Sequence, residues 1–439
     1  MKMKRTLVFI LVPPLLLLAG AAAQKPAGNK VAIASERKLI SVKVTGTERY
    51  TDKEIVPAAG LQLGENVGDA DFKEAARRLG DTGMFTDVAY SFSYSALGTK
   101  LELQLKDAGE NKLVPAHFEN FVWFKDANLI SELQRRVSLF KLALPVDGTL
   151  LDHVVEALQA MLDEKQVPGR VSYLRESPPE GGALTGIAFR VDYMDIRIRE
   201  VEFPGAAPDH VPLLKAAARK LTGAEYFRSP LVKVAEVDFL PVYLQRGYLE
   251  AFFAPSEARV ATQSSSQVEV DAIFAVTPGK VYSTSEVAWK GNAALPTEQL
   301  QPLLHMPAGQ PANAVRLADD LEQVARLYHT RGYMNAHIRP VPLMDEAKDT
   351  VHYDLNVEEG DQFKMGELEL RGLDSQSTAR LRETWTLREG EPYNADYPNK
   401  FVEDSTRLLP GGVHWGISIH ESLNAADKSV DVTIHFTPR

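Results

Sequence analysis

Apolar and polar residues alternate in the first hundred positions in a way that predicts a small α+β unit. The alternation over 40–45 predicts a half-buried strand, and a capping box of Thr51 and Glu54 predicts a short helix. A second helix is predicted by apolar residues three or four positions apart: Phe72, Ala75, Ala76 and Leu79. Alternation returns over 88–94 and 101–105. The expected order is therefore strand, helix, helix, strand, strand.

The chain repeats this pattern with a nearly constant period. Three pairs of residues are each 81 positions apart: Gly279 and Gly360, Tyr282 and Phe363, and Gly291 and Gly372. Matches that keep one offset without a gap indicate an internal duplication.

A second repeated sequence, which we call the signature, occurs in addition to those residue pairs. Segment 243–251 reads Tyr-Leu-Gln-Arg-Gly-Tyr-Leu-Glu-Ala, and segment 328–336, 85 positions later, reads Tyr-His-Thr-Arg-Gly-Tyr-Met-Asn-Ala. Segment 83–85, Gly-Met-Phe, is a looser form of it. The glycine and aromatic positions of the signature are Gly83, Phe85, Gly247, Tyr248, Gly332 and Tyr333. Glycine accepts the left-handed backbone that ends a helix, so a structural role is expected for these triplets.

The period divides the chain into five expected units. Their boundaries are 38–108, 109–193, 194–278, 279–359 and 360–439, and the fifth unit is divergent. Each unit has about 80 residues and is expected to lean on its neighbours, because a chain of that size buries a modest fraction of its surface. With almost no linker between units, we expect an extended curved array.

The N-terminus has the three parts of a secretory signal. Lys2, Lys4 and Arg5 precede an apolar run, and the run ends in an A-x-A cleavage site at Ala23. An uncleaved anchor is the alternative, but a proline pair at 13–14 and the shortness of the run disfavour it. We expect a signal peptide over 1–23, a disordered leader over 24–37, and no transmembrane segment in the mature chain.

Composition narrows the class of function. Apolar residues make up 44% and charged residues 25%, as in ordinary globular proteins, and the net charge is −10. The acidic balance argues against nucleic acid as a partner. There is no cysteine, and no motif for phosphate binding or nucleophilic catalysis is present. We expect no enzyme activity, no catalytic residues, no cofactor and no metal; His414 and His420 are expected to be solvated.

The repeated unit resembles the POTRA (polypeptide-transport-associated) domain. The resemblance is carried by the Arg-Gly-Tyr triplets, by Gly83-Met84-Phe85, by Val44-Thr45-Gly46, and by Val357-Glu358-Glu359-Gly360. Five tandem units are similar to the periplasmic part of BamA-type outer-membrane protein assembly factors. The expected fold is α+β, with five POTRA-like units.

Three features depart from that family. No β-barrel is expected after the fifth unit. Unit five has Pro410-Gly411-Gly412 in place of Arg-Gly-Tyr, so the family's geometry is not carried over to this unit. In unit three, Pro241 falls within the second helix and should kink it.

The resemblance implies a periplasmic scaffold that is associated with the outer membrane. Its expected partners are unfolded outer-membrane or secreted polypeptides and a separate outer-membrane barrel protein or envelope complex. Extended peptides would add to an exposed sheet edge, which is formed by the strand after an Arg-Gly-Tyr triplet. The expected peptide-binding residues are Leu249, Ala251, Phe252 and Phe253 in unit three and Met334, Ala336 and Ile338 in unit four.

Two alternatives stay open. The protein could instead be an adaptor with fixed partners in an envelope complex for cell division or lipid transport. The aromatic strand of unit one, with Tyr90, Phe92 and Tyr94, could be a docking edge, although its alternation favours core packing against the helices.

Overall fold

A computed structural model describes residues 37–411 and 413–439, and these form two compact units. The first unit comprises the described residues up to Leu113 with Val137–Lys141 and Pro145–Leu151, and the second comprises Val114–Arg136, Leu142–Leu144 and Asp152–Arg439. The expected signal peptide, 1–23, lies outside the described residues, as does all of the expected leader except Arg37.

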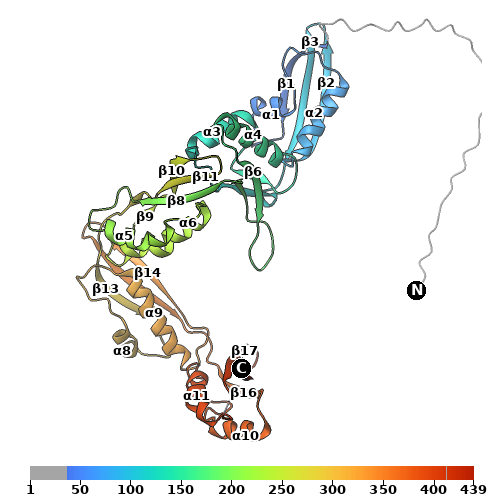
Figure 1. The fold of residues 1–439 in the computed structure, drawn as a ribbon. Helices are drawn as coiled ribbons and strands as arrows, with labels where there is room; N and C mark the ends of the chain where they lie inside the picture. The colour runs from blue at the N-terminus through green and yellow to red at the C-terminus, as the bar shows by residue number, and fades with distance from the viewer. Residues whose placement is uncertain (1–36, 412) are drawn as a thin grey trace, which may run out of the picture. The chain divides into compact units, whose positions relative to one another are not determined.

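The first repeat has the expected order of elements (Figure 1). They are β1 (Leu39–Thr45), α1 (Asp52–Ala58), α2 (Asp69–Asp81), β2 (Phe85–Ser95) and β3 (Gly98–Asp107). The sheet order is β1-β3-β2, so the last strand lies in the middle. The capping box is confirmed, since the Glu54 carboxylate accepts the Thr51 N–H at 2.8 Å. Phe72 and Leu79 of α2 are buried, as are alternate leucines of β3.

The second repeat carries a fourth strand. Its elements are β4 (Leu113–Phe118), α3 (Asp126–Arg136), β5 (Ala143–Pro145), α4 (Leu150–Glu164), β6 (Arg170–Glu176) and β7 (Gly186–Asp192). The sheet order is β5-β4-β7-β6. A short 3-10 helix, η2 (Glu110–Lys112), precedes β4.

The third repeat has a broken second helix and a broken edge strand. Its elements are β8 (Asp195–Glu202), α5 (Val211–Ala217), η3 (Ala218–Leu221), α6 (Arg228–Val234), the π-helical turn η4 (Ala235–Phe239), α7 (Leu240–Leu244), β9 (Phe252–Phe253), β10 (Glu257–Gln263), β11 (Gln267–Ile273) and β12 (Val276–Thr277). The sheet order is β10-β11-β8, and β9 pairs with β12. The disturbance expected at Pro241 is thus present, as a π-turn just before the proline.

The fourth and fifth repeats return to the regular order. The fourth has β13 (Ser283–Lys290), α8 (Thr297–Leu300), η5 (Gln301–Leu303), α9 (Ala314–His329), β14 (His337–Asp345) and β15 (Thr350–Glu358). The fifth has β16 (Lys364–Arg371), α10 (Ser375–Thr384), α11 (Tyr397–Ser405), η6 (Thr406–Leu408), β17 (Trp415–Asn424) and β18 (Ser429–Pro438). Both sheets have their last strand in the middle, in the orders β13-β15-β14 and β16-β18-β17. The fifth repeat therefore keeps the sheet topology although it lacks the Arg-Gly-Tyr triplet.

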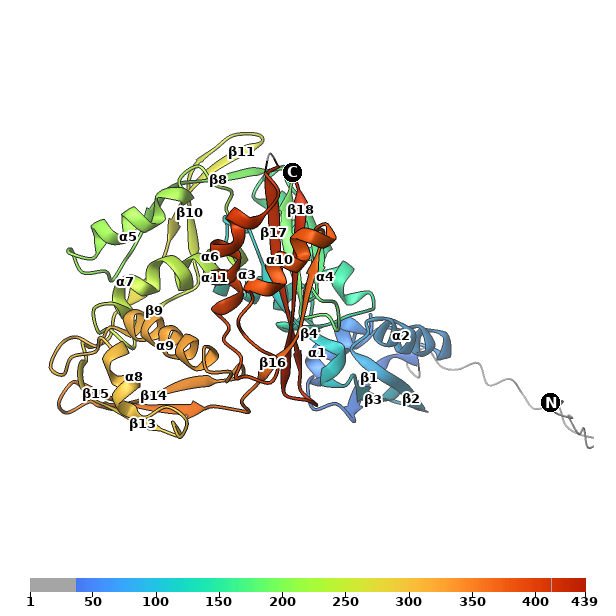
Figure 2. The same ribbon diagram turned by 90° about the horizontal axis from the view of Figure 1, so that it is seen from below.

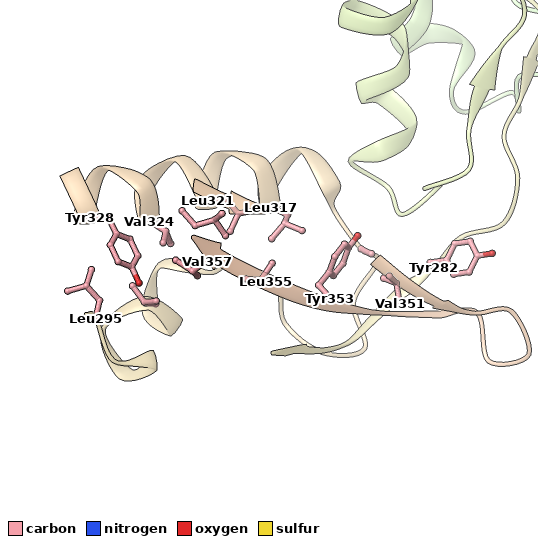
Figure 3. Packing of buried hydrophobic residues seen from close by; sticks show 13 residues of the cluster. Tyr282, Leu295, Leu317, Leu321, Val324, Tyr328, Val351, Tyr353, Leu355 and Val357 are labelled. Carbon is pink, nitrogen blue, oxygen red and sulfur yellow. The ribbon is translucent and has the colours of Figure 1, made fainter. Parts of the chain in front are cut away.

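Each repeat has its core between its helices and one face of its sheet, as Figure 3 shows for the fourth. One face of α9 presents Leu317, Leu321, Val324 and Tyr328 to alternate residues of β15, which are Val351, Tyr353, Leu355 and Val357. Full burial of each aliphatic side chain contributes about 1.5–3 kcal/mol. The spacing of these apolar residues, three to four on the helix and two on the strand, is why this segment folds as helix on sheet.

The same connection recurs in all five repeats. The first strand pairs in parallel with the last, as in β1–β3, β4–β7, β8–β11, β13–β15 and β16–β18. A parallel pair requires a crossover, and the two helices supply it on one face of the sheet (Figure 2). The fold is thus α+β with five sheet-and-helix repeats, whereas the unit boundaries expected from the sequence stay predictions. Over the described ranges, no helix is both long and apolar enough to cross a membrane.

Candidate functional site

The Arg-Gly-Tyr triplets lie where one repeat meets the next. Gly247 and Gly332 end their helices with φ angles of 85° and 87°. The Gly247 carbonyl accepts the Tyr282 N–H at 2.8 Å, and the Gly332 carbonyl accepts the Phe363 N–H at 2.7 Å. A Cβ atom on Gly247 would lie 2.6 Å from the Tyr282 carbonyl oxygen, and one on Gly332 would meet the Phe363 carbonyl more closely still. The signature therefore ends a helix and also docks the following repeat.

The other residues that were expected to have a structural role are glycines with positive φ and aromatic residues in ring contacts. Gly46, Gly291 and Gly372 have positive φ and approach the backbone of the last strand of their own repeat. Gly83 approaches the Asp147 backbone, and Gly360 also has positive φ. The remaining aromatic residues of the set are buried or half-buried at ring contacts: Phe85 against Tyr50, Tyr248 against Tyr243, and Tyr333 against Tyr328.

The expected peptide-binding segment of repeat three contains β9, which pairs with β12, whereas β10 is an edge of the three-stranded sheet. Phe252 and Phe253 form β9, whereas Leu249 and Ala251 lie in the turn before it. Ala254 donates its N–H to the Ala275 carbonyl at 2.9 Å. Because backbone groups alternate along an antiparallel strand, the N–H and C=O of Phe253 face away from β12. Among the described residues no strand pairs with that side of β9.

A groove of about 300 Å³ runs between β9 and the second helix of repeat three. Its lining is mostly apolar and consists of Leu231, Val232, Ala235, Glu236, Leu240, Ala251, Phe252, Phe253, Ala254, Pro255, Ser256 and Phe274. We call it the repeat-three groove. The Phe252 side chain is 59% exposed at its rim. The Phe253 ring packs 5.8 Å from the rings of Phe239 and Tyr243.

The helix that forms the groove wall differs from α9 of repeat four. It has one additional residue between its first and last buried apolar positions. The buried apolar residues of the repeat-three helix recur every four positions, at Leu231, Ala235, Phe239 and Tyr243. The buried apolar residues of α9 follow a four-three-four spacing. A strict spacing of four drifts around a helix of 3.6 residues per turn, and a π-turn absorbs the drift. Pro241 favours the break at the same place, because it cannot donate to the carbonyl four residues earlier.

A residue of repeat two anchors the start of this wall. The Glu119 carboxylate is buried and accepts the Ser229 N–H at 3.0 Å and the Ser229 hydroxyl. Arg228 donates its N–H to the Glu119 carbonyl at 3.2 Å, and its guanidinium pairs with Asp126 at 2.5 Å. Helix α6 is thus capped from outside its own repeat. Glu119 was missed in the sequence, because a cap 110 positions away leaves no local signal.

The edge of repeat four is built differently. Ile338 is buried within β14, and Met334 and Ala336 precede that strand. Pro340 and Pro342 both lie inside β14, opposite Leu355 and Tyr353. Prolines persist in a sheet where their nitrogens face away from the partner strand. Two of the outward positions of β14 therefore have no N–H to offer an added strand.

The aromatic strand of repeat one packs against α2 but stays partly exposed, with Tyr90 half-buried and Phe92 36% exposed. The Tyr90 and Phe92 rings lie 6.3 Å and 4.9 Å from the Phe72 ring of α2. The Tyr94 side chain is half-exposed beyond them. His414 and His420 are exposed, as expected.

Comparison with known proteins identifies the repeat. The sequence model of the POTRA family, described as a surface antigen variable number repeat, matches residues 282–360. Repeat four of this chain therefore matches the POTRA family. The matched span includes the sheet and helix α9 of repeat four.

A curated relative extends the similarity over half of this chain. The outer membrane protein assembly factor BamA of Neisseria meningitidis serogroup B is 23% identical over 233 residues, which are 50% of this chain and 28% of that protein. The chain therefore matches less than a third of the length of this relative.

Solved POTRA structures are also similar. The structure of POTRA3-5 of Haemophilus influenzae BamA has a TM-score of 0.42 and 18% identity, and covers 55% of this chain and 95% of its own. POTRA1-3 of Omp85 from Anabaena has a TM-score of 0.26 and 18% identity, with 55% and 95% covered. Both TM-scores lie below 0.5.

Proposed function

We propose that this chain is a periplasmic polypeptide-binding scaffold that assists outer-membrane protein assembly or polypeptide transport. The curated relative is an outer membrane protein assembly factor, which supports this class of role. The partners would be unfolded outer-membrane or secreted polypeptides, together with a separate outer-membrane barrel protein or envelope complex. No catalytic step is part of this function.

The observation that carries the proposal is the repeat-three groove beside the unpaired side of β9. An extended peptide would pair with the outward N–H and C=O of Phe253 and place alternate apolar side chains in the groove. Main-chain pairing does not depend on side-chain identity. Strands of outer-membrane proteins alternate apolar and polar residues over about ten positions, which suits a groove with one apolar side.

The proposal is tested by the affinity of the purified chain for a ten-residue peptide that alternates apolar and polar residues. The first variant is Val232→Asp, which places a charge on the groove wall. The matched control is Val237→Asp, because Val237 is exposed on the same helical segment but does not line the groove. Binding should be lost in the first variant and kept in the second.

A second arm tests main-chain pairing from the side of the ligand. The same peptide, N-methylated at two alternate residues, keeps its side chains but loses two donors. One of these donors would pair with the Phe253 carbonyl, and loss of that bond costs about 0.5–1.5 kcal/mol, so binding should weaken about two- to tenfold. This arm avoids Phe252→Pro, since the alternation places the Phe252 N–H on the β12 side, where proline would damage the sheet itself. Equal affinity for the two peptides would exclude strand addition, and no binding of either would favour the adaptor with fixed partners.

A further inference from the structure

The repeat-three groove carries one ionisable side chain among the described residues that line it. That residue is Glu236, which is exposed in the π-turn η4. The described part of the chain provides no ion pair for its carboxylate. Lys233 lies one turn earlier without lining the groove, and Lys220 pairs with Asp238 at 2.7 Å. The groove is therefore apolar, and its wall carries one negative charge that has no ion-pair partner among the described residues.

We propose that the repeat-three groove selects extended apolar segments that carry a lysine or arginine beside Glu236. This inference rests on the proposed function and specifies the chemistry of the polypeptide. A basic side chain on the ligand would lie next to the carboxylate, while an acidic one would be repelled. The apolar walls contribute affinity without regard to charge, so Glu236 would set preference rather than binding as such.

The expected size of the preference follows from the exposure of Glu236. Exposed ion pairs contribute about 0.2–1 kcal/mol, which corresponds to an affinity ratio of up to about fivefold. The preference should weaken with added salt, because exposed charges are screened.

The experiment uses three peptides that differ at one position, which is Lys, Gln or Glu, with the full chain. Wild type should bind the Lys peptide most tightly and the Glu peptide least. Glu236→Gln should bring the three affinities together, and Glu236→Lys should reverse their order.

Repeat four offers a matched control. Glu322 holds the corresponding place in α9, 86 positions on, just as Leu321 corresponds to Ala235, and it is also exposed. Glu322→Lys makes the same change in net charge away from the groove and should leave the order of affinities unchanged. This control is needed because the chain as a whole is acidic, with a net charge of −10.

The outcomes distinguish failure of the charge preference from failure of the proposed scaffold function. If wild type binds all three peptides equally, the charge preference is wrong and the scaffold function stands. If Glu322→Lys alters the order as much as Glu236→Lys does, the overall field of the protein sets the preference, and the inference is overturned. If none of the peptides binds, the proposed function itself fails.

Discussion

Repeats three and four share their signature and differ in almost everything that concerns a ligand. Both end the second helix at an Arg-Gly-Tyr glycine, and in both this glycine accepts a backbone N–H of the next repeat. Repeat four has a continuous helix, α9, and a continuous edge strand, β14, that contains two prolines. Repeat three has a π-turn in the helix, a divided edge strand and a groove between them. The signature thus specifies how repeats connect, whereas the proposed peptide site depends on local departures from the repeat.

The helix caps differ in the same way. Helix α9 is capped by its own Asn313, whose side chain accepts the Arg316 N–H at 2.8 Å. Helix α6 is capped by Glu119 of repeat two. The helix that forms the wall of the repeat-three groove is therefore capped by a neighbouring repeat, whereas α9 is capped by a residue of its own repeat.

The largest effect is expected from placing a side chain at the shared glycines. Gly247→Ala and Gly332→Ala should each lower the free energy of unfolding by about 1–2 kcal/mol for the left-handed conformation alone, with a further loss from the clash with the next repeat. Gly309→Ala is the control, because Gly309 has a φ of 77° and open space around its Cβ position. Denaturant unfolding measures the difference. Equal losses in all three variants would mean that the glycines do not dock the next repeat.

The caps should separate stability from binding. Glu119→Ala should cost about 0.5–2 kcal/mol and weaken peptide binding to the repeat-three groove, because α6 loses its anchor. Glu119→Gln keeps an accepting oxygen and should retain most of the binding. Asn313→Ala should cost a similar free energy of unfolding and leave peptide affinity unchanged. The dependence of the groove on repeat two is wrong if Asn313→Ala weakens binding as much as Glu119→Ala.

The helix tyrosines provide a smaller contrast. The Tyr328 hydroxyl donates to the Glu359 carboxylate at 2.9 Å, whereas the buried Tyr243 hydroxyl has no hydrogen-bond partner among the described residues. Tyr328→Phe should lower the free energy of unfolding by about 0.5–1.5 kcal/mol, and Tyr243→Phe should be neutral or stabilising. Calorimetry of the two variants checks this, and equal losses would contradict it.

The same tyrosine carries a pH dependence. Burial, together with the hydrogen bond to Glu359, raises the pKa of Tyr328 above its ordinary value. The folded state therefore holds this proton more tightly than the unfolded chain, and the associated stability is lost as pH rises past the ordinary tyrosine pKa. That alkaline loss should be smaller in Tyr328→Phe.

The smallest effect concerns the edge strand of repeat four, β14, where two prolines remove outward N–H groups. Replacing Pro340 and Pro342 with threonine restores two outward N–H groups on β14. In the Val232→Asp background, weak binding of the alternating peptide should return. Continued absence of binding, with the sheet intact by circular dichroism, would show that the edge needs a groove as well as free donors.

Much of the fold could be predicted from local pattern. Alternation in β3, the three-to-four spacing in α2 and α9, and the capping box at Thr51 each specify an element within a few residues of chain. The constant offset between repeats extended this prediction to the weaker units. The position of Phe252 and Phe253 on an edge strand followed from the same reasoning, whereas Leu249, Ala251, Met334 and Ala336 lie in turns before the strands.

Only the tertiary structure decided what distinguishes one edge from another. The cap from Glu119, the π-turn that adjusts a four-residue spacing and the groove beside Phe253 all arise from contacts between segments that are distant in the chain. Sequence periodicity reports which face of an element is buried, because burial imposes a repeat on the residues of that element. Periodicity does not indicate which element packs on the buried face, or where packing leaves a groove. The sequence therefore determined a repeated scaffold, and packing between its parts decided which repeat has a groove beside its edge strand.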